Sequence, residues 1–179
     1  MTESDEETAL IKQAQNGDRI AFESLLRNHY DLIFRIAFKW CGNRTDAEDI
    51  TQNACIKLGR SIGTFRFQSA FSSWLYRLVI NTAKDWAKAR PLPMMDLENE
   101  PGGGQAPTGE AKVYARQVMD YVRTMPEREQ AALCLVFSEG LSHREAAVVM
   151  ECKEKTVSWY IHEARKKLQA FKELERHYG

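Results

Sequence analysis

Residues 153–168 carry cations, hydroxyl groups and an aromatic ring at spacings that suit contact with duplex DNA. A helix in the major groove places its first residues against base edges, while flanking cations meet backbone phosphates. A helix that begins near residue 155 would expose such side chains, and we predict that it contacts DNA. The candidate contacts are Lys153, Lys155, Thr156, Ser158, Trp159, His162, Arg165 and Lys166.

A second short helix before this segment makes a helix-turn-helix. Ser142 suits the N-cap position, and Glu145 stands three residues later, as a capping box requires. Ala146 and Ala147 are small enough to let two helices cross closely, and residues 151–153 suit a turn. The pattern predicts a DNA-binding helix-turn-helix. A plain helical hairpin with a solvated, charged face is the competing interpretation.

Aromatic, basic and amide side chains are interleaved in a segment that Gly63 marks as a loop. Aromatic rings stack on unpaired bases and Arg meets phosphates, so this mixture suits single-stranded nucleic acid. A pocket that bonds the edge of a base also offsets the cost of flipping that base from the duplex. By contrast, Phe71 and Trp74 fall on an apolar stripe, which favours the core. The candidate contacts in the loop are Phe65, Arg66, Phe67, Gln68 and Ser69.

Asp46, Glu48 and Asp49 form an acidic cluster that invites a metal or carboxylate-pair interpretation. No His lies near them at ligand spacing, and acids in a first helical turn are favoured by the helix dipole in any case. The sequence offers no Ser–His–Asp arrangement and no Gly-rich phosphate loop. We therefore expect no metal, no cofactor and no enzymatic activity, and we interpret the cluster as a face for protein docking.

Apolar residues recur at helical spacing, and no alternating strand pattern occurs, so we predict an all-α fold. Thr45 is a candidate N-cap, with Glu48 as its capping-box partner. Gly42 marks the end of the preceding helix. The expected helical segments are 10–15, 22–41, 46–58, 70–89, 110–124, 127–139, 143–150 and 155–168, with a loop over 61–69.

A segment with Pro, Gly and acidic residues divides the chain at 91–110. It has little to bury and is too long for a loop inside one compact domain. We expect two domains, residues 9–90 and 111–175, on a flexible linker. The net charge is zero, yet residues 9–90 hold 13 Lys and Arg against 7 Asp and Glu, while the linker holds four acids and no base. Basic domains around an acidic linker are typical of proteins that bind polyanions.

The composition is that of a globular protein. Hydrophobic residues make up 44% and charged residues 28% of the 179 residues, a balance that argues against wholesale disorder. No apolar run of about 18 residues occurs, so we expect no membrane insertion. The acidic N-terminus lacks the apolar core of a secretory signal, and four Cys without a CxxC pair suit reduced thiols. We expect a cytoplasmic protein.

Two parts of the sequence resemble the extracytoplasmic-function (ECF) sigma factors, group IV of the sigma-70 family. Residues 46–52 (DAEDITQ) and 71–81 (FSSWLYRLVIN) resemble region 2 of that family. Residues 126–147, which include the Gly140–Leu141–Ser142 helix start, and 164–168 resemble its region 4. The order of the motifs, the linker between them and the overall length are also similar, and the resemblance covers nearly the whole chain.

The resemblance implies a protein that binds core RNA polymerase, reads the −35 promoter element with region 4 and melts the −10 element with region 2. The implied partners are the β′ clamp helices and β flap of polymerase, promoter DNA and an anti-sigma factor. The loop over 63–70 would capture a flipped base, and the helix over 155–168 would face the −35 element. Polymerase contacts would come from Asp46, Glu48, Asp49 and Gln52. Contacts to −10 DNA would come from the five loop residues above and from Arg77, Asn81, Lys84 and Lys88.

Two departures from the family's pattern affect the binding surfaces. Residues 53–55 read Asn-Ala-Cys where many members carry an acidic and then a bulkier residue, which changes the docking face. Trp159 and Glu163 stand where basic residues are frequent. Trp159 would touch a thymine methyl and Glu163 would accept from a cytosine amino group, so we expect an unusual −35 sequence.

Two alternatives remain open from the sequence. A stand-alone helix-turn-helix regulator would form a dimer on a palindromic site, whereas a sigma factor is expected to be a monomer when free and to read two unlike elements. That alternative leaves the loop over 63–70 and the acidic cluster without a role. A metal-dependent nuclease on a helical scaffold is the other alternative, and it lacks convergent metal ligands.

Overall fold

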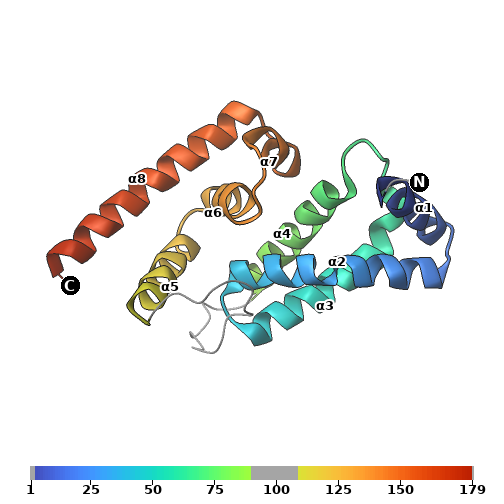
Figure 1. Ribbon diagram of the computed structural model, residues 1–179, viewed down its shortest axis with the longest axis horizontal. Coiled ribbons are helices and arrows are strands. Elements are labelled where there is room, and N and C mark those ends of the chain that lie inside the picture. The colour runs from blue at the N-terminus through green and yellow to red at the C-terminus, as the bar shows by residue number, and fades with distance from the viewer. Residues whose placement is uncertain (1–2, 90–108, 179) are drawn as a thin grey trace. The chain divides into compact units, whose positions relative to one another are not determined.

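The computed structural model describes residues 3–89 and 109–178, and the chain splits into two compact units, Met1–Met94 and Met95–Gly179 (Figure 1). Every regular element within the described residues is helical, which confirms the all-α prediction. The linker expected over 91–110 lies outside the described residues except for its last two positions, which begin a helix. Those two residues therefore belong to the second unit's first helix rather than to a connecting segment.

The N-terminal unit is a helical bundle with an additional helix at its beginning. Its elements are α1 (Glu3–Gln15), α2 (Arg19–Cys41), α3 (Arg44–Ser61), the 3-10 turn η1 (Ile62–Thr64) and α4 (Phe71–Ala89). The helices α2, α3 and α4 pack against one another, and α1 packs against α2 and η1. The shared core is aliphatic, with Leu25, Ile33, Ile50, Leu58 and Leu75 fully buried. Burial of this apolar surface is what holds the bundle together.

Local signals fix the helix ends of this unit. Asp18 caps α2 by accepting hydrogen bonds from two backbone amides of its first turn. Gly42 ends α2 at φ +83, a left-handed conformation that favours glycine. Asn43 caps α3, because its Oδ1 accepts a hydrogen bond from the backbone amide of Asp46 at 2.8 Å. The predicted cap, Thr45, is therefore wrong by two residues and lies inside the helix.

The helix α1 begins at Glu3, although the apolar stripe in the sequence begins only at Leu10. Ile11 and Ala14 are its buried contacts with the rest of the unit. The acidic residues that precede them suit the first turns of a helix, where the macrodipole favours negative charge. The helix expected over 10–15 therefore begins seven residues earlier than its predicted start.

The C-terminal unit consists of α5 (Gly109–Arg123), α6 (Glu127–Leu133), the π-helical turn η2 (Cys134–Ser138), α7 (His143–Val149) and α8 (Glu154–Tyr178). Both α6 and α7 pack against α8, and η2 packs against both of the shorter helices. Leu135, Ala146, Val157 and Ala164 are fully buried at these contacts. Small residues at the crossings let α7 and α8 approach each other, as the helix-turn-helix prediction requires.

Two features of this unit differ from the sequence prediction. The helix expected over 127–139 is α6 followed by a π-helical turn, in which the Glu139 amide donates to the Cys134 carbonyl oxygen five residues earlier, at 3.0 Å. The helix α8 also continues past residue 168, where its predicted end lay, to Tyr178. The rings of Phe171 on α8 and Tyr121 on α5 stack with centroids 4.5 Å apart, which gives the extended part of α8 a packing partner.

Candidate functional site

The helix α8 has a buried face and an exposed face. Val157, Ile161 and Ala164 recur at helical spacing and are buried against α6 and α7. Of the eight side chains predicted for −35 contact, Thr156 is half-buried and the other seven are exposed. Trp159 is 55% exposed, an unusual degree for so large an apolar side chain. The structure therefore places the predicted residues on the outward side of the second helix of a helix-turn-helix.

The first helix of this motif begins as the sequence predicts. The Glu145 amide donates to Ser142 Oγ at 3.2 Å, and the Ser142 amide donates to Glu145 Oε2 at 2.8 Å, which completes a capping box. The Ser142 hydroxyl and amide hydrogen bonds lower the pKa of the Glu145 carboxyl. At the other end of α7, Arg128 Nη1 donates to the Met150 carbonyl oxygen at 3.1 Å. Both ends of the short helix are thus held by side chains.

Two side chains from preceding elements contact the predicted DNA-binding face. His143 Nδ1 on α7 lies 2.9 Å from Ser158 Oγ on α8. Phe137, in η2, lies under the guanidinium of Arg165, whose central carbon is 5.1 Å from the ring centroid. Phe137 is 55% exposed and is not among the residues predicted from the sequence. A π-helical turn in the sequence is hard to distinguish from an α-helix, so no signal located Phe137 beside Arg165.

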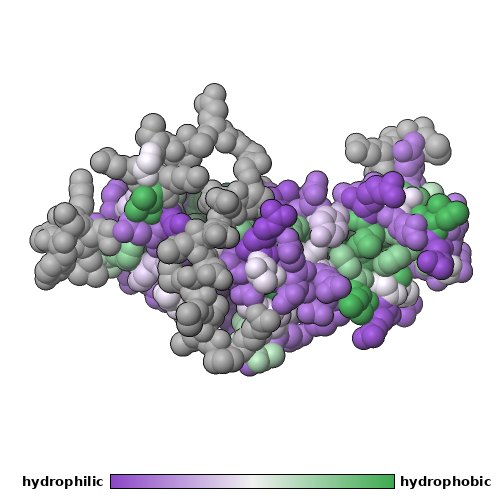
Figure 2. Space-filling view, turned by 90° about the horizontal axis from the view of Figure 1, so that it is seen from below, coloured by the Kyte–Doolittle hydropathy of each residue, from purple (hydrophilic) through white to green (hydrophobic). Residues whose placement is uncertain are grey.

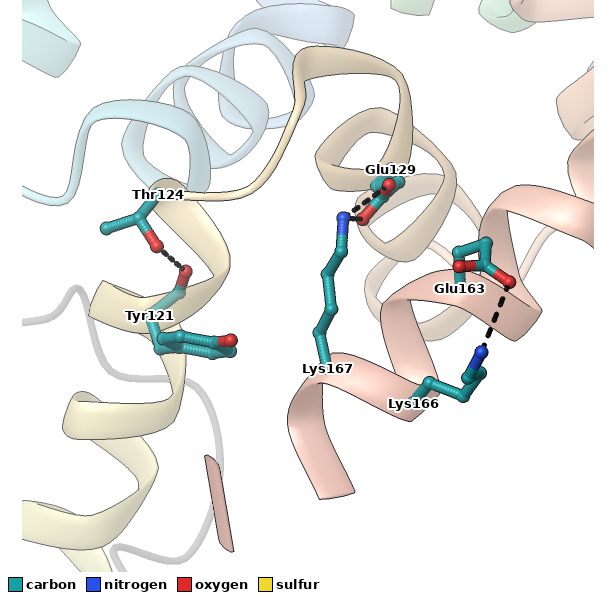
Figure 3. A network of polar contacts seen from close by, with 6 residues as sticks. All are labelled: Tyr121, Thr124, Glu129, Glu163, Lys166 and Lys167. Carbon is teal, nitrogen blue, oxygen red and sulfur yellow. Dashed lines mark hydrogen bonds and ion pairs between the residues drawn. The ribbon is translucent and has the colours of Figure 1, made fainter. Parts of the chain in front are cut away.

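Two lysines of α8 pair with carboxylates that differ in burial (Figure 3). Lys166 Nζ lies 4.0 Å from Glu163 Oε1 on the helix surface. Lys167 Nζ lies 2.7 Å from both carboxylate oxygens of Glu129 on α6, and the Glu129 side chain is only 7% exposed. Glu163, predicted to accept a hydrogen bond from a cytosine amino group, has a half-buried side chain. The pair of Lys167 and Glu129 joins α6 to the helix that carries the predicted contacts.

The loop after η1 presents some of its predicted contacts and buries another. Arg66, Phe67 and Gln68 are exposed, with Phe67 at 41%, and Ser69 is half-buried. Phe65 is only 5% exposed. Its ring packs against those of Phe67, Phe71 and Trp74 at centroid distances of 4.9, 5.3 and 5.7 Å. The prediction that Phe65 contacts DNA is therefore corrected, because the aromatic cluster occupies its ring.

The remaining predicted −10 contacts share one side of α4. Arg77, Asn81, Lys84 and Lys88 are spaced by four, three and four residues, which places them on a common helix face. Asn81 and Lys88 are exposed, and Arg77 and Lys84 are half-buried. Lys84 Nζ lies 6.0 Å from the centroid of the Trp40 ring on α2. This arrangement gives the helix that follows the aromatic loop a polar and basic stripe.

The helix α3 carries the predicted docking residues. Glu48 and Gln52 are exposed, and Asp49 is half-buried. Asp46 is 8% exposed, and its carboxylate accepts a hydrogen bond at 2.7 Å from the side-chain amide of Asn43, the residue that caps the helix. Its predicted role as a polymerase contact is corrected, because the carboxylate is taken up in building the start of α3.

Ile56 extends the exposed face of α3 and is not among the residues predicted for docking. It is 47% exposed, and it follows Glu48 and Gln52 at intervals of four residues. That spacing, measured from the acidic cluster, is the signal that would have identified it. Ile56 adds an apolar side chain to the acidic and amide groups of this face, and protein interfaces combine apolar and polar contacts in this way.

The described surface visible in Figure 2 is mostly hydrophilic, with apolar residues in separate patches. No group of three His, Cys, Asp or Glu side chains that could hold a metal occurs in residues 3–89 and 109–178. Among the helices of those same ranges, none has the length and apolar character needed to cross a bilayer.

Burial raises the pKa of the Cys55 thiol, which lowers its thiolate fraction.

Family comparisons match both units separately. Residues 25–90 match the family model described as Sigma-70 region 2, and residues 115–168 match the one described as Sigma-70, region 4. The first match covers α3, the aromatic loop and α4. The second covers the helix-turn-helix.

Relatives of similar length match nearly the whole chain. The ECF RNA polymerase sigma-E factor of Haemophilus influenzae is 33% identical, over 94% of this chain and 96% of that protein. The RNA polymerase sigma-H factor of Pseudomonas aeruginosa is 31% identical, over 92% of this chain and 93% of that protein. The ECF RNA polymerase sigma-E factor of Escherichia coli K12 is also 31% identical, with the same coverage.

Two solved structures share the fold at lower identity. CnrH, solved in complex with the cytosolic domain of CnrY, gives a TM-score of 0.71 at 22% identity and covers 94% of this chain and 98% of its own. The sigma factor RpoE of Bartonella quintana, solved with the anti-sigma factor NepR, gives a TM-score of 0.62 at 16% identity, over 83% of this chain and 94% of its own.

Proposed function

The chain belongs to the ECF sigma factors of the sigma-70 family, and from that premise we propose how its surfaces divide the work of promoter recognition. A sigma factor directs promoter-specific initiation by binding RNA polymerase and promoter DNA. Membership of the family is established by a sequence identity of about one third along nearly the full chain and by matches to both sigma regions. The alternative of a stand-alone dimeric regulator is not favoured, because it gives the matched N-terminal unit no role.

The C-terminal unit recognises the −35 element with the exposed face of α8 in the major groove. The support is the separation of a buried apolar face from a face of cations, hydrogen-bonding groups and Trp159. Lys153 and Lys155 precede or begin the helix, where contact with phosphates positions a recognition helix. The proposed contacts are Lys153, Lys155, Thr156, Ser158, Trp159, His162, Arg165 and Lys166.

The N-terminal unit melts the −10 element and holds its exposed strand. The loop offers a ring, a guanidinium and an amide that are all exposed, which suits stacking on a base, contact with phosphate and hydrogen bonding to a base edge. The stripe on α4 continues the path for the sugar-phosphate backbone. The proposed contacts are Arg66, Phe67, Gln68, Ser69, Arg77, Asn81, Lys84 and Lys88.

The N-terminal unit docks on the β′ clamp helices of core polymerase through α3. Glu48, Asp49 and Gln52 supply charge and hydrogen bonds, and Ile56 supplies apolar contact on the same face. Asp46 acts indirectly, by holding the first turn of the helix. The C-terminal unit binds the β flap of core polymerase.

Further partners follow from the same membership. Two structural neighbours of this chain were solved with protein partners, the cytosolic domain of CnrY and the anti-sigma factor NepR. We infer that an anti-sigma factor also holds this protein inactive by covering polymerase-binding surface. The protein acts in the cytoplasm as a monomer until it joins core polymerase. Sigma factors initiate transcription without a catalytic site or cofactor of their own.

Polymerase makes two weak DNA contacts act together. Each unit alone offers a small basic surface, and fixing both units on one enzyme turns the second contact into an intramolecular event. The free protein is therefore expected to bind duplex promoter weakly, and the holoenzyme strongly. A filter-binding comparison at physiological salt tests this. A sequence-specific complex of the isolated protein with nanomolar affinity would contradict it.

A further inference from the structure

The helix α1 lies outside residues 25–90, which match the region 2 family, yet its last turn holds the loop that follows η1. Gln15 Nε2 donates hydrogen bonds to the carbonyl oxygens of Ile62 and Phe65, both at 2.9 Å. A side-chain amide nitrogen has two N–H donors, and both donors of Gln15 bond to this short stretch of backbone. The start of the loop is thereby tied to a side chain 47 residues earlier in the chain.

A second side chain of α1 reaches the exposed ring of the loop. Lys12 stands one turn before Gln15, and its Nζ lies 5.7 Å from the centroid of the Phe67 ring. A cation over an aromatic face is attracted by the ring quadrupole. The Phe67 ring also packs against that of Phe65, at a centroid distance of 4.9 Å. The same face of α1 therefore contacts both the backbone and the tip of the loop.

The loop needs such support because its backbone is strained. Phe67 has φ +57, in the left-handed region that residues with bulky side chains rarely adopt. A strained conformation persists only where the surrounding structure enforces it, and such residues gather at ligand-binding positions. This turn presents Arg66, Phe67 and Gln68 outward. The two Gln15 hydrogen bonds hold the backbone immediately before it.

We propose that Gln15 is a positioning residue for recognition of the −10 element. Its two hydrogen bonds set the shape of the loop that accepts the flipped base. The inference rests on the proposed function of that loop and adds α1 to the machinery. Loss of the two hydrogen bonds removes one support of the backbone from Ile62 to Phe65, and the loop then meets DNA in more than one conformation. Discrimination between −10 bases falls, while the docking face on α3 is unaffected.

The test uses full-length variants assembled with core polymerase. Run-off transcription is measured on a promoter that the wild-type holoenzyme uses and on the same promoter with single-base changes in its −10 element. Gln15→Ala is expected to lower transcript output on the intact promoter by about fivefold to tenfold, the effect of one or two lost hydrogen bonds. The ratio of output on the intact promoter to output on each altered promoter is also expected to fall. Gln13→Ala, an exposed glutamine on the same helix, is the matched control and is expected to behave as wild type.

Two results would overturn the proposal. One is wild-type output and discrimination in the Gln15→Ala holoenzyme, and the other is an equal fall on every −10 sequence, which marks a general structural role. Lys12→Met removes the cation over Phe67 and leaves the two Gln15 hydrogen bonds in place. This second variant is expected to lose less discrimination between −10 sequences than Gln15→Ala. A separate result would show that the loop itself does not recognise the −10 element. In that case Gln68→Ala would leave the preference among −10 sequences unchanged in the same assay.

Discussion

The guanidinium carbon of Arg165 lies 5.1 Å from the centroid of the Phe137 ring, so a side chain of the π-helical turn supports one on the recognition helix. Arginine stacks on an aromatic face through both its charge and its plane, and keeps its edge donors available for other partners. Phe137 thereby restricts the conformations of Arg165 before DNA arrives. A donor held in place loses less entropy on binding than a free one.

Replacement of Arg165 by Ala should weaken −35-dependent transcription by about 1–3 kcal/mol, the effect of one lost DNA contact. Arg165→Lys keeps the charge and loses the planar guanidinium, so it should recover only part of the activity. The measurement is run-off transcription on promoters with intact and altered −35 elements. Lys172→Ala, at an exposed position on the same helix, is the control. Equal effects of the two alanine variants would remove Arg165 from the proposed contacts.

Asp49→Lys should abolish binding to core polymerase, because it reverses charge at a half-buried position on the docking face of α3. We expect the fold to remain, because the buried Ala47 and Ile50 of the same helix are unchanged. The assay is co-elution of purified variant and core polymerase, with circular dichroism as the check on folding. Asp31→Lys reverses an exposed charge on α2 of the same unit and should co-elute normally. Unchanged co-elution of Asp49→Lys would refute the assignment of the docking face.

Gln68→Ala should alter preference among −10 sequences and leave −35 preference as it is. The side-chain amide is exposed in the loop and offers both a donor and an acceptor to a base edge. Outputs are compared on a panel of −10 variants, with Asn28→Ala on α2 as an exposed amide control. A uniform loss at every promoter would instead indicate damage to the fold.

Lys167→Met should destabilise the C-terminal unit by about 2 kcal/mol, because it leaves the carboxylate of Glu129 buried and unpaired. The effect is below that of a fully buried pair, since Lys167 is 38% exposed. Hydrogen exchange in α6 and α8 reports the change. Glu129→Gln in the Lys167→Met background should restore part of the stability by removing the charge. Lys166→Met disrupts only the 4.0 Å pair with Glu163, in which the Lys166 side chain is 67% exposed, and should change stability by less than about 0.5 kcal/mol.

Thr51→Val should stabilise the N-terminal unit by about 1 kcal/mol. Thr51 is 1% exposed, and its hydroxyl oxygen has no hydrogen-bond partner among the described residues. An apolar group of the same shape removes the cost of that buried hydroxyl. Thr82 is the matched control, because it is equally buried but its hydroxyl donates to the Leu78 carbonyl oxygen at 2.8 Å. Urea unfolding should therefore show a gain for Thr51→Val and none for Thr82→Val.

The parts that the sequence predicts well are those governed by local spacing. The buried stripe through Val157 and Ile161 follows from the helical period, and that period also selects the exposed residues of α8. The capping box of Ser142 and Glu145 depends on two residues three positions apart. The start of α3 is predicted two residues too late, because Asn43 and Thr45 are both of types that cap helices and only the chain geometry selects between them.

The parts that the sequence misses depend on contacts between distant residues. Phe65 and Phe67 are both aromatic residues in one loop, and their different burial is set by packing against Phe71 and α1. Lys167 and Glu129 are 38 residues apart and form one pair that no local pattern indicates. The hydrogen bonds from Gln15 span a still longer separation.

Run-off transcription with purified core polymerase, with and without this protein, tests the central claim most directly. The template is a pool of fragments from the organism's own genome. Discrete transcripts that appear only when the protein is present are the predicted result, and their aligned upstream sequences should share two unlike elements at −35 and −10. Failure to produce transcripts together with failure to co-elute with core polymerase would contradict the claim.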